Sequence, residues 1–170
     1  LVGDNTLATD LAAIRASGLT IDTIDMGSSA KITEAQAATL VSSGVDLHFA
    51  ATDDITLEAA AGSTHLTTSL KDLQKLGVDT VSVASAASGA DLHVTLGDGA
   101  AISLANGALP SFGADSALNV TLDVKSVSQL AEVAALAGTA GVDLAAKGLD
   151  NVSLNLADQT QLDALLAANV

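Results

Sequence analysis

The chain has 170 residues, 49% of them apolar, but only two aromatic side chains, Phe49 and Phe112. Its 17 Asp and three Glu against six basic residues give a net charge of −14, so nucleic acid and anionic lipid are not expected partners. The lack of cysteine excludes disulfides, thiolate metal sites and cysteine nucleophiles. An interior of small aliphatic side chains predicts thin repeating layers and disfavours a deep ligand pocket.

One phrase recurs along the chain: an Ala- and Leu-rich helix, a glycine that ends it, and a strand that begins with an aliphatic residue and often Asp. Its copies are Leu11–Ile24, Ala35–Phe49, Ser69–Val83 and Leu130–Ala146, and Leu162–Val170 starts another. Gly and Asn accept the left-handed conformation that closes a helix. The predicted caps are Gly18, Gly44, Gly77, Gly141 and Asn169, separated by 26, 33, 64 and 28 residues.

The helix starts also carry signals. Thr33 is the predicted N-cap of the second helix, with Gln36 three residues later as its capping-box partner. Thr68 or Ser69 is the predicted N-cap of the third. These helices are short, so packing against a sheet has to hold them.

Strand-like segments alternate with the helices, which predicts an α/β fold with a mainly parallel sheet. A unit of this length cannot bury its own apolar face, so we expect a solenoid-like or layered array of helix–Gly–strand units. Residues 1–96 and 117–170 are interpreted as repeat units. Residues 97–116, which include the only proline, Pro110, are interpreted as an irregular insertion or bend. The pattern starts and stops within a unit, which indicates a fragment of a longer chain.

The segments Ile32–Leu57 (ITEAQAATLVSSGVDLHFAATDDITL) and Thr64–Val83 (THLTTSLKDLQKLGVDTVSV) resemble the tandem-repeat regions of giant exported bacterial adhesins and biofilm-matrix proteins, many of them secreted by type I systems. The resemblance implies an extracellular or cell-surface, elongated module that tolerates or requires calcium. The Gly- and Asp-rich nonapeptide that binds calcium in many such proteins is absent from the sequence, and Gly97-Asp98-Gly99 is its nearest counterpart.

Aspartates are the candidate calcium ligands, because hard cations prefer carboxylate and carbonyl oxygens. Asp53, Asp54 and Asp98 lie in polar turns, although no EF-hand spacing is present. The strand after each capping glycine carries Asp46, Asp79 or Asp143, and stacking is expected to align these three as a ladder that faces solvent or binds cations. The alternative for Asp53, Asp54 and Asp98 is that each is a turn or cap residue.

Histidines offer a second candidate site. His48 and His93 each end an Asp-Leu-His triplet on a predicted strand, where alternation places Asp and His on one face. Two such pairs side by side can form a mixed oxygen and nitrogen metal site. The alternative is that repeated strands reuse the same polar face. His65 precedes a helix and is interpreted as part of a turn.

Catalytic motifs are lacking: the sequence has no G-x-S-x-G, P-loop, dinucleotide fingerprint or H-E-x-x-H. We therefore predict no enzyme, no catalytic residues and no required cofactor, and Ca²⁺ is a candidate ligand. The longest uncharged apolar stretches, such as Val133–Val142, are too short to span a bilayer, so no membrane insertion is expected.

The predicted function is an extracellular structural or adhesive repeat module whose partners are neighbouring repeats or copies of itself, associated end to end. The alternative is a calcium- or glycan-binding module of a secreted protein, with surface glycans as partners. A polysaccharide-acting enzyme domain is the least favoured, because sugar platforms are usually aromatic and this chain has few aromatic residues.

Overall fold

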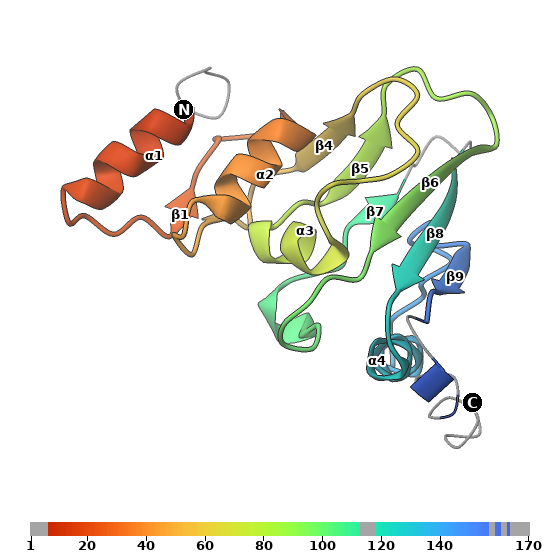
Figure 1. The fold of residues 1–170 in the computed structure, drawn as a ribbon. Helices are drawn as coiled ribbons and strands as arrows, with labels where there is room; N and C mark the ends of the chain where they lie inside the picture. The colour runs from red at the N-terminus through yellow and green to blue at the C-terminus, as the bar shows by residue number, and fades with distance from the viewer. Residues whose placement is uncertain (1–6, 113–117, 157–158, 161–162, 164–170) are drawn as a thin grey trace.

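The computed structural model describes residues 7–112, 118–156, 159–160 and 163. The helices are α1 (Leu7–Ala16), α2 (Glu34–Ser42), α3 (Leu70–Leu76), α4 (Val127–Ala137) and the 3₁₀ turn η1 (Leu104–Asn106). The strands are β1 (Thr23–Ile24), β2 (Ala30–Thr33), β3 (His48–Phe49), β4 (Ile55–Ala59), β5 (Thr80–Val83), β6 (Ala90–Thr95), β7 (Ser111–Phe112), β8 (Leu118–Val124) and β9 (Asn151–Leu154). In Figure 1, α1, α2 and α3 follow one another along the molecule, and α1 and β9 lie toward opposite ends.

The strands form three sheets in which every described pairing is parallel: sheet A has the order β1-β3, sheet B β2-β4-β5-β7 and sheet C β6-β8-β9. Ala30 pairs with Ile55, 25 positions later, and Thr80 pairs with Ser111, 31 positions later. A parallel partner requires a crossover of this length, and here it usually contains a short helix. The predicted α/β class with mainly parallel sheets is confirmed.

The helix starts follow the predicted capping chemistry. The Thr33 side chain accepts a hydrogen bond from the Gln36 N–H, and Gln36 Oε1 accepts one from the Thr33 N–H at 2.8 Å, which confirms the capping box. Ser69, not Thr68, caps α3 by accepting from the N–H of Asp72. These bonds satisfy N–H groups that the first helical turn leaves unpaired.

Two of the predicted helix ends behave differently. Gly77 caps α3 in the left-handed conformation, with φ of 75°, as predicted. The prediction that Gly141 caps the fourth helix is wrong: α4 ends at Ala137, and its C-cap is Gly138, whose N–H bonds to the Ala134 carbonyl at 3.0 Å. The first of two nearby glycines ends the helix, because glycine weakens a helix wherever it occurs. The predicted cap Asn169 lies outside the described residues.

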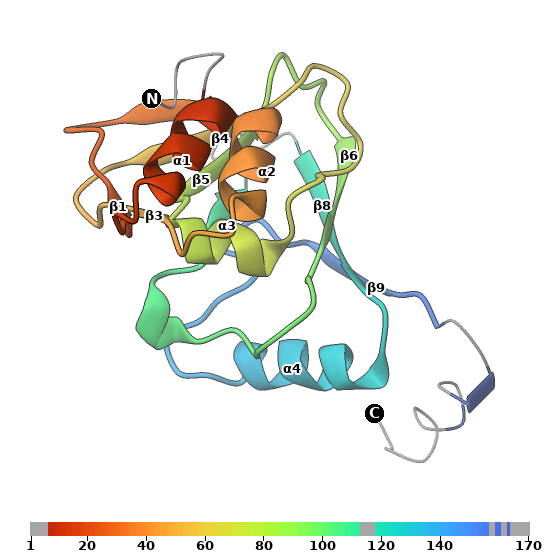
Figure 2. The same cartoon turned by 60° about the vertical axis from the view of Figure 1, so that its left-hand side comes forward.

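Strand residues alternate between the interior and the surface. In β4, Ile55, Leu57 and Ala59 are buried, while the side chains between them are partly exposed. The same pattern continues in β6 and β8. The buried strand residues join buried helix residues such as Leu40 and Leu73 in one continuous core. Each of these sheets therefore turns one face inward and a polar face outward. In Figure 2, α1, α2 and α3 lie next to one another and α4 lies apart from them.

The sequence predicts an irregular insertion or bend over residues 97–116, and the structure describes residues 97–112 of it. Gln74 on α3 is buried, and its side-chain amide donates to the carbonyls of Ser103 and Gly107 at 3.2 and 3.0 Å. Residues 111–112 then pair with β5 as β7. Glycine is needed at Gly148, since a Cβ there would collide with the Phe112 carbonyl. The segment is thus tied to α3 and leads back into sheet B.

One buried hydroxyl generates a stability test. The Thr68 Oγ1 has no hydrogen-bond partner among the described residues, and Thr68 is only 3% exposed. Thr68→Val keeps the side-chain shape and removes an unpaired polar group, so we expect the free energy of unfolding to rise by about 1 kcal/mol. Urea denaturation measures the change. The matched control is Thr67→Val, which loses the exposed contact with Glu34 and is expected to gain nothing. A lower free energy of unfolding in Thr68→Val would contradict the conclusion that the Thr68 hydroxyl is buried without a hydrogen-bond partner.

Candidate functional site

An acidic groove lies beside α3. Its volume is about 900 Å³, and its walls come from residues 46–53, α3, residues 77–79 between α3 and β5, and the 98–108 loop. Four of the six aspartates predicted as calcium ligands line it: Asp46, Asp53, Asp79 and Asp98. Asp72, Lys71 and Lys75 contribute further charges. The fold therefore gathers most of the predicted carboxylates around one groove.

Two of these carboxylates bind backbone. Asp53 is 6% exposed, and its Oδ2 accepts a hydrogen bond from the Met26 N–H at 2.8 Å. Asp79 Oδ2 accepts one from the N–H of Ile55, also at 2.8 Å, while the Asp79 N–H donates to the Ile55 carbonyl at 2.9 Å. Both aspartates thus satisfy a backbone donor on the neighbouring segment.

The other two have weaker partners. Asp46 is 3.0 Å from Lys75 Nζ, but the two side chains are 87% and 61% exposed, so this ion pair contributes about 0–1 kcal/mol. Asp98 is exposed, with Oδ1 at 3.5 Å from Gln129 Nε2. The side chains of both aspartates are exposed.

Asp54 and Asp143 do not line the groove. The Asp54 side chain is exposed, and its backbone carbonyl accepts the Ala30 N–H at 3.0 Å. Asp143 Oδ1 accepts the Ala146 N–H at 2.9 Å in a turn after α4. Asp46, Asp79 and Asp143 therefore do not align as one ladder. Asp46 comes before β3 of sheet A, Asp79 comes before β5 of sheet B, and Asp143 lies in a turn outside the sheets.

Sequence reasoning missed a further aspartate of the same kind. Asp150 Oδ2 accepts the Val120 N–H at 2.9 Å, and the Asp150 N–H donates to the Val120 carbonyl at 3.0 Å. This repeats the contacts of Asp79 with Ile55. The signal was available in the sequence, since Asp79 and Asp150 each directly precede a strand. Within the described part of the chain, no group of three or more His, Cys, Asp and Glu side chains is arranged to hold a metal ion.

His48 and His93, the candidate pair for a mixed metal site, do not lie side by side. His48 lies in β3 of sheet A, with Nε2 3.4 Å from Thr23 Oγ1, whereas His93 lies in β6 of sheet C. The interpretation of His65 as a turn residue also needs correction, because His65 forms an isolated parallel bridge with His93. The two Asp-Leu-His triplets lie in different sheets because they follow their helices differently. His48 is in β3, the first strand after α2, whereas His93 is in β6, the second strand after α3.

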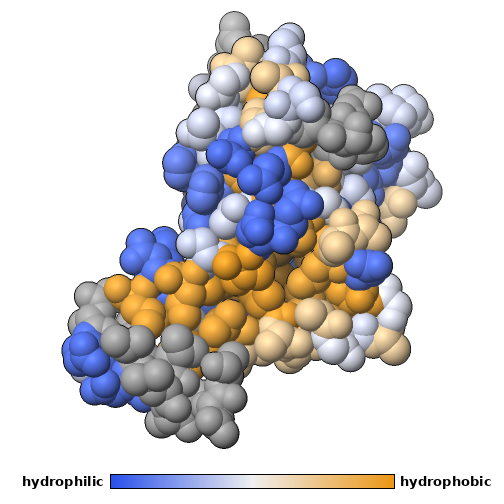
Figure 3. All heavy atoms as spheres, turned by 90° about the vertical axis from the view of Figure 1, so that its right-hand side faces the viewer, coloured by the Kyte–Doolittle hydropathy of each residue, from blue (hydrophilic) through white to orange (hydrophobic). Residues whose placement is uncertain are grey.

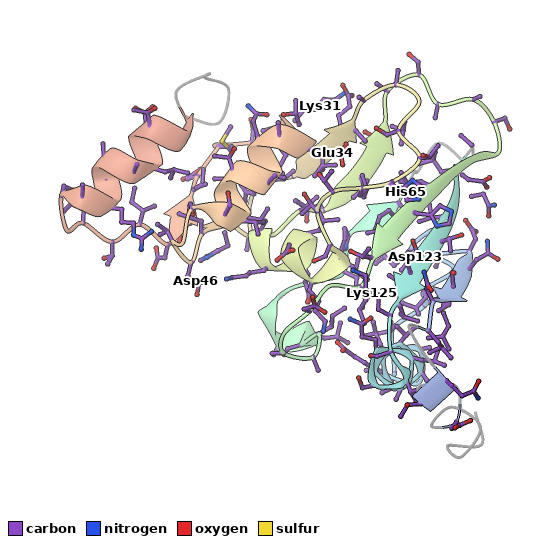
Figure 4. All side chains as sticks on the ribbon, viewed as in Figure 1. Lys31, Glu34, Asp46, His65, Asp123 and Lys125 are labelled. Carbon is purple, nitrogen blue, oxygen red and sulfur yellow. The ribbon has the colours of Figure 1, made fainter. Side chains whose placement is uncertain are left out.

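The outer face of sheet C carries a regular set of polar side chains. Asn119 Nδ2 donates to Asp91 Oδ1 at 2.6 Å, and Asn151 Nδ2 donates to Asn119 Oδ1 at 2.9 Å, so three neighbouring strands are joined by one row of side-chain bonds. Further along β6, His93 pairs in register with Thr121, and His93 Nδ1 lies diagonally 3.1 Å from Asp123 Oδ2. Figure 4 shows His65 and Asp123 beside β6.

Comparison with known proteins adds no relative: no family model, curated protein or solved structure matches the chain. Among the described residues, no helix combines the length and apolar character that crossing a membrane requires.

The contact between Asp79 and the Ile55 backbone can be tested by substitution. Asp79→Ala leaves the Ile55 N–H without its acceptor, so we expect a loss of about 1 kcal/mol in the free energy of unfolding. Chemical denaturation measures it. Asp54→Ala is the matched control and is expected to change stability by less than about 0.5 kcal/mol, because its side chain is exposed. Equal effects of the two substitutions would show that the carboxylate contact contributes nothing.

Proposed function

We infer that the chain is a structural module in which each stretch of 24–31 residues forms one winding that stacks on the next as a solenoid. The observation that carries this proposal is the register of the strands. Every described pairing between strands joins a residue to another 24–31 positions later, in parallel. Within each sheet the strand order rises steadily with the sequence. A doubly wound α/β domain differs, since its strand order reverses at a switch point.

The polar outer faces of sheets B and C support the same proposal. Parallel sheets of ordinary α/β domains are covered on both faces and are apolar throughout. Here the residues between the buried positions of β4 are Thr56 and Glu58, and the outer face of β6 carries Asp91, His93 and Thr95. A stack of windings needs cover on one face only, because each winding covers the flank of its neighbour.

A structural or adhesive role outside the cell follows as the proposed biological function. The acidic, cysteine-free composition and the resemblance of residues 32–57 and 64–83 to adhesin repeats support it. Figure 3 views the molecule from the side of sheet C and shows apolar side chains gathered on the lower half of this face, below a polar area. On the same sheet, Val152 of β9 is 48% exposed. This face supports end-to-end contact with a neighbouring repeat or a second copy.

Duplicating one winding tests the solenoid. A second copy of Lys31–Ile55 inserted after Ile55 preserves the register, because Ala30 and Ile55 are paired positions. We expect a folded protein whose maximum dimension grows by about 5–10 Å, the spacing of neighbouring strands at one limit and of packed helices at the other. Small-angle X-ray scattering measures the dimension, and hydrogen exchange shows whether the new amides are protected.

The control carries the same 25 inserted residues in scrambled order at the same site. The scrambled insert is expected to stay unprotected from exchange. The solenoid is excluded if the amides of the true duplicate also stay unprotected. It is equally excluded if the protein with the true duplicate is unfolded while the protein with the scrambled insert is folded.

Calcium binding is the second candidate function, motivated by the presence of Asp46, Asp53, Asp79 and Asp98 on the walls of one groove, where no three described carboxylates yet form a metal site. A ligand of the native state at 100 times its Kd stabilises by about 2.7 kcal/mol, so millimolar Ca²⁺ is expected to raise the melting temperature. Asp98→Asn should reduce the shift, whereas Asp143→Asn, outside the groove, should leave it unchanged. The same melting temperature with and without millimolar Ca²⁺ would remove this candidate.

A further inference from the structure

Two of the three histidines lie side by side on the outer face of sheet C. The N–H of His93 donates to the Thr64 carbonyl, and the His93 carbonyl accepts the Leu66 N–H, both at 2.8 Å, so His65 and His93 are paired positions on parallel segments. Side chains at paired positions project from the same face of a sheet. Their rings are stacked, with centroids 4.8 Å apart and planes inclined by 16°.

In both rings Nδ1 is already engaged. His93 Nδ1 lies 3.1 and 3.2 Å from the two carboxylate oxygens of Asp123. An ionised carboxylate only accepts hydrogen bonds, so Nδ1 carries the proton and Nε2 of a neutral His93 presents a lone pair. His65 Nδ1 lies 3.0 Å from Thr64 Oγ1. Neither Nε2 makes a hydrogen bond with the residues that the structure describes.

A carboxylate on one imidazole nitrogen with the other nitrogen open is the arrangement found behind metal-bound histidines. The carboxylate fixes the tautomer and the ring orientation and makes the ligating nitrogen more basic. Imidazole nitrogens suit Zn²⁺, Cu²⁺ and Ni²⁺, whereas Ca²⁺ and Mg²⁺ prefer oxygen. We propose that Nε2 of His65 and Nε2 of His93 together bind a divalent transition-metal ion such as Zn²⁺, with Asp123 as the residue that positions His93.

Binding requires one ring to turn. A metal ion lies in the plane of each imidazole that it binds at 2.0–2.1 Å, and two rings inclined by only 16° with centroids 4.8 Å apart have no such common point. His65 is exposed, and the second side-chain torsion of histidine is broad, so the His65 ring can turn out of the stack and direct its Nε2 toward an ion bound at Nε2 of His93. Two coordination positions remain for water. The site depends only on three side chains of sheet C and the segment beside it, so it does not rest on the solenoid proposal.

The third histidine provides a matched control. His48 lies in sheet A, and its Nε2 is 3.4 Å from Thr23 Oγ1. It is exposed, as His65 is, and its substitution removes the same chemical group. Zinc that binds merely to any histidine of an acidic surface would respond equally to the loss of His48 or of His65.

The experiment is a titration of the full chain with Zn²⁺, followed by calorimetry and by the NMR signals of the histidine rings. Excess Mg²⁺ is present so that oxygen-only sites are occupied. The wild-type chain and His48→Ala are expected to bind one ion with equal affinity, and His65→Ala and His93→Ala to lose this binding. Asp123→Asn is expected to weaken the affinity about 10–100-fold, because a ligating ring loses its orienting partner.

Circular dichroism of each variant establishes that it is folded, and the exposed His65→Ala keeps the test valid if His93→Ala is unstable. The proposal is overturned if wild-type protein binds no Zn²⁺ at millimolar concentration. It is equally overturned if folded His65→Ala binds as wild type does, or if His48→Ala loses as much affinity as His65→Ala.

Discussion

Parallel pairing between segments 24–31 residues apart is the constraint on which the rest of the structure depends. A parallel strand cannot be reached by a tight turn, so the chain must cross over between partners. Here each crossover is short, which limits the helices to 7–11 residues. Helices of this length are marginal alone, and their buried leucines, such as Leu40 and Leu73, hold them against the strands. Capping bonds then fix where they begin.

The acidic residues have a structural role as well as a role in solvation. Asp53, Asp79 and Asp150 each accept a backbone N–H from a segment 24–30 residues earlier. At these places a side chain takes the role that a strand carbonyl has elsewhere in the ladder. Aspartate suits this role because its short side chain can accept a hydrogen bond from a nearby backbone N–H in a non-helical segment. Many of the remaining carboxylates face solvent.

Local signals in the sequence predicted local structure well. The capping box of Thr33 and Gln36, the cap at Gly77 and the parallel α/β class all depend on contacts between residues close in sequence or on strand–helix alternation. Sheet membership was not predictable in this way. His48 and His93 share a triplet but lie in different sheets, since assignment to a sheet depends on how many strands follow each helix. Likewise, the position of an Asp in the sequence does not reveal whether its carboxylate contacts a backbone N–H, a lysine or solvent.

One geometric mismatch in this architecture has a consequence for shape. Strands β2, β4 and β5 are neighbours at the usual spacing of about 4.8 Å, whereas neighbouring helices such as α1, α2 and α3 need about 8–10 Å between axes. Joining the two spacings in successive segments makes the helical side longer than the strand side. In the proposed stack of windings, this difference bows the array, with the helices on its convex side and the strands on its concave side. Further windings of the same kind would trace an arc, not a straight rod.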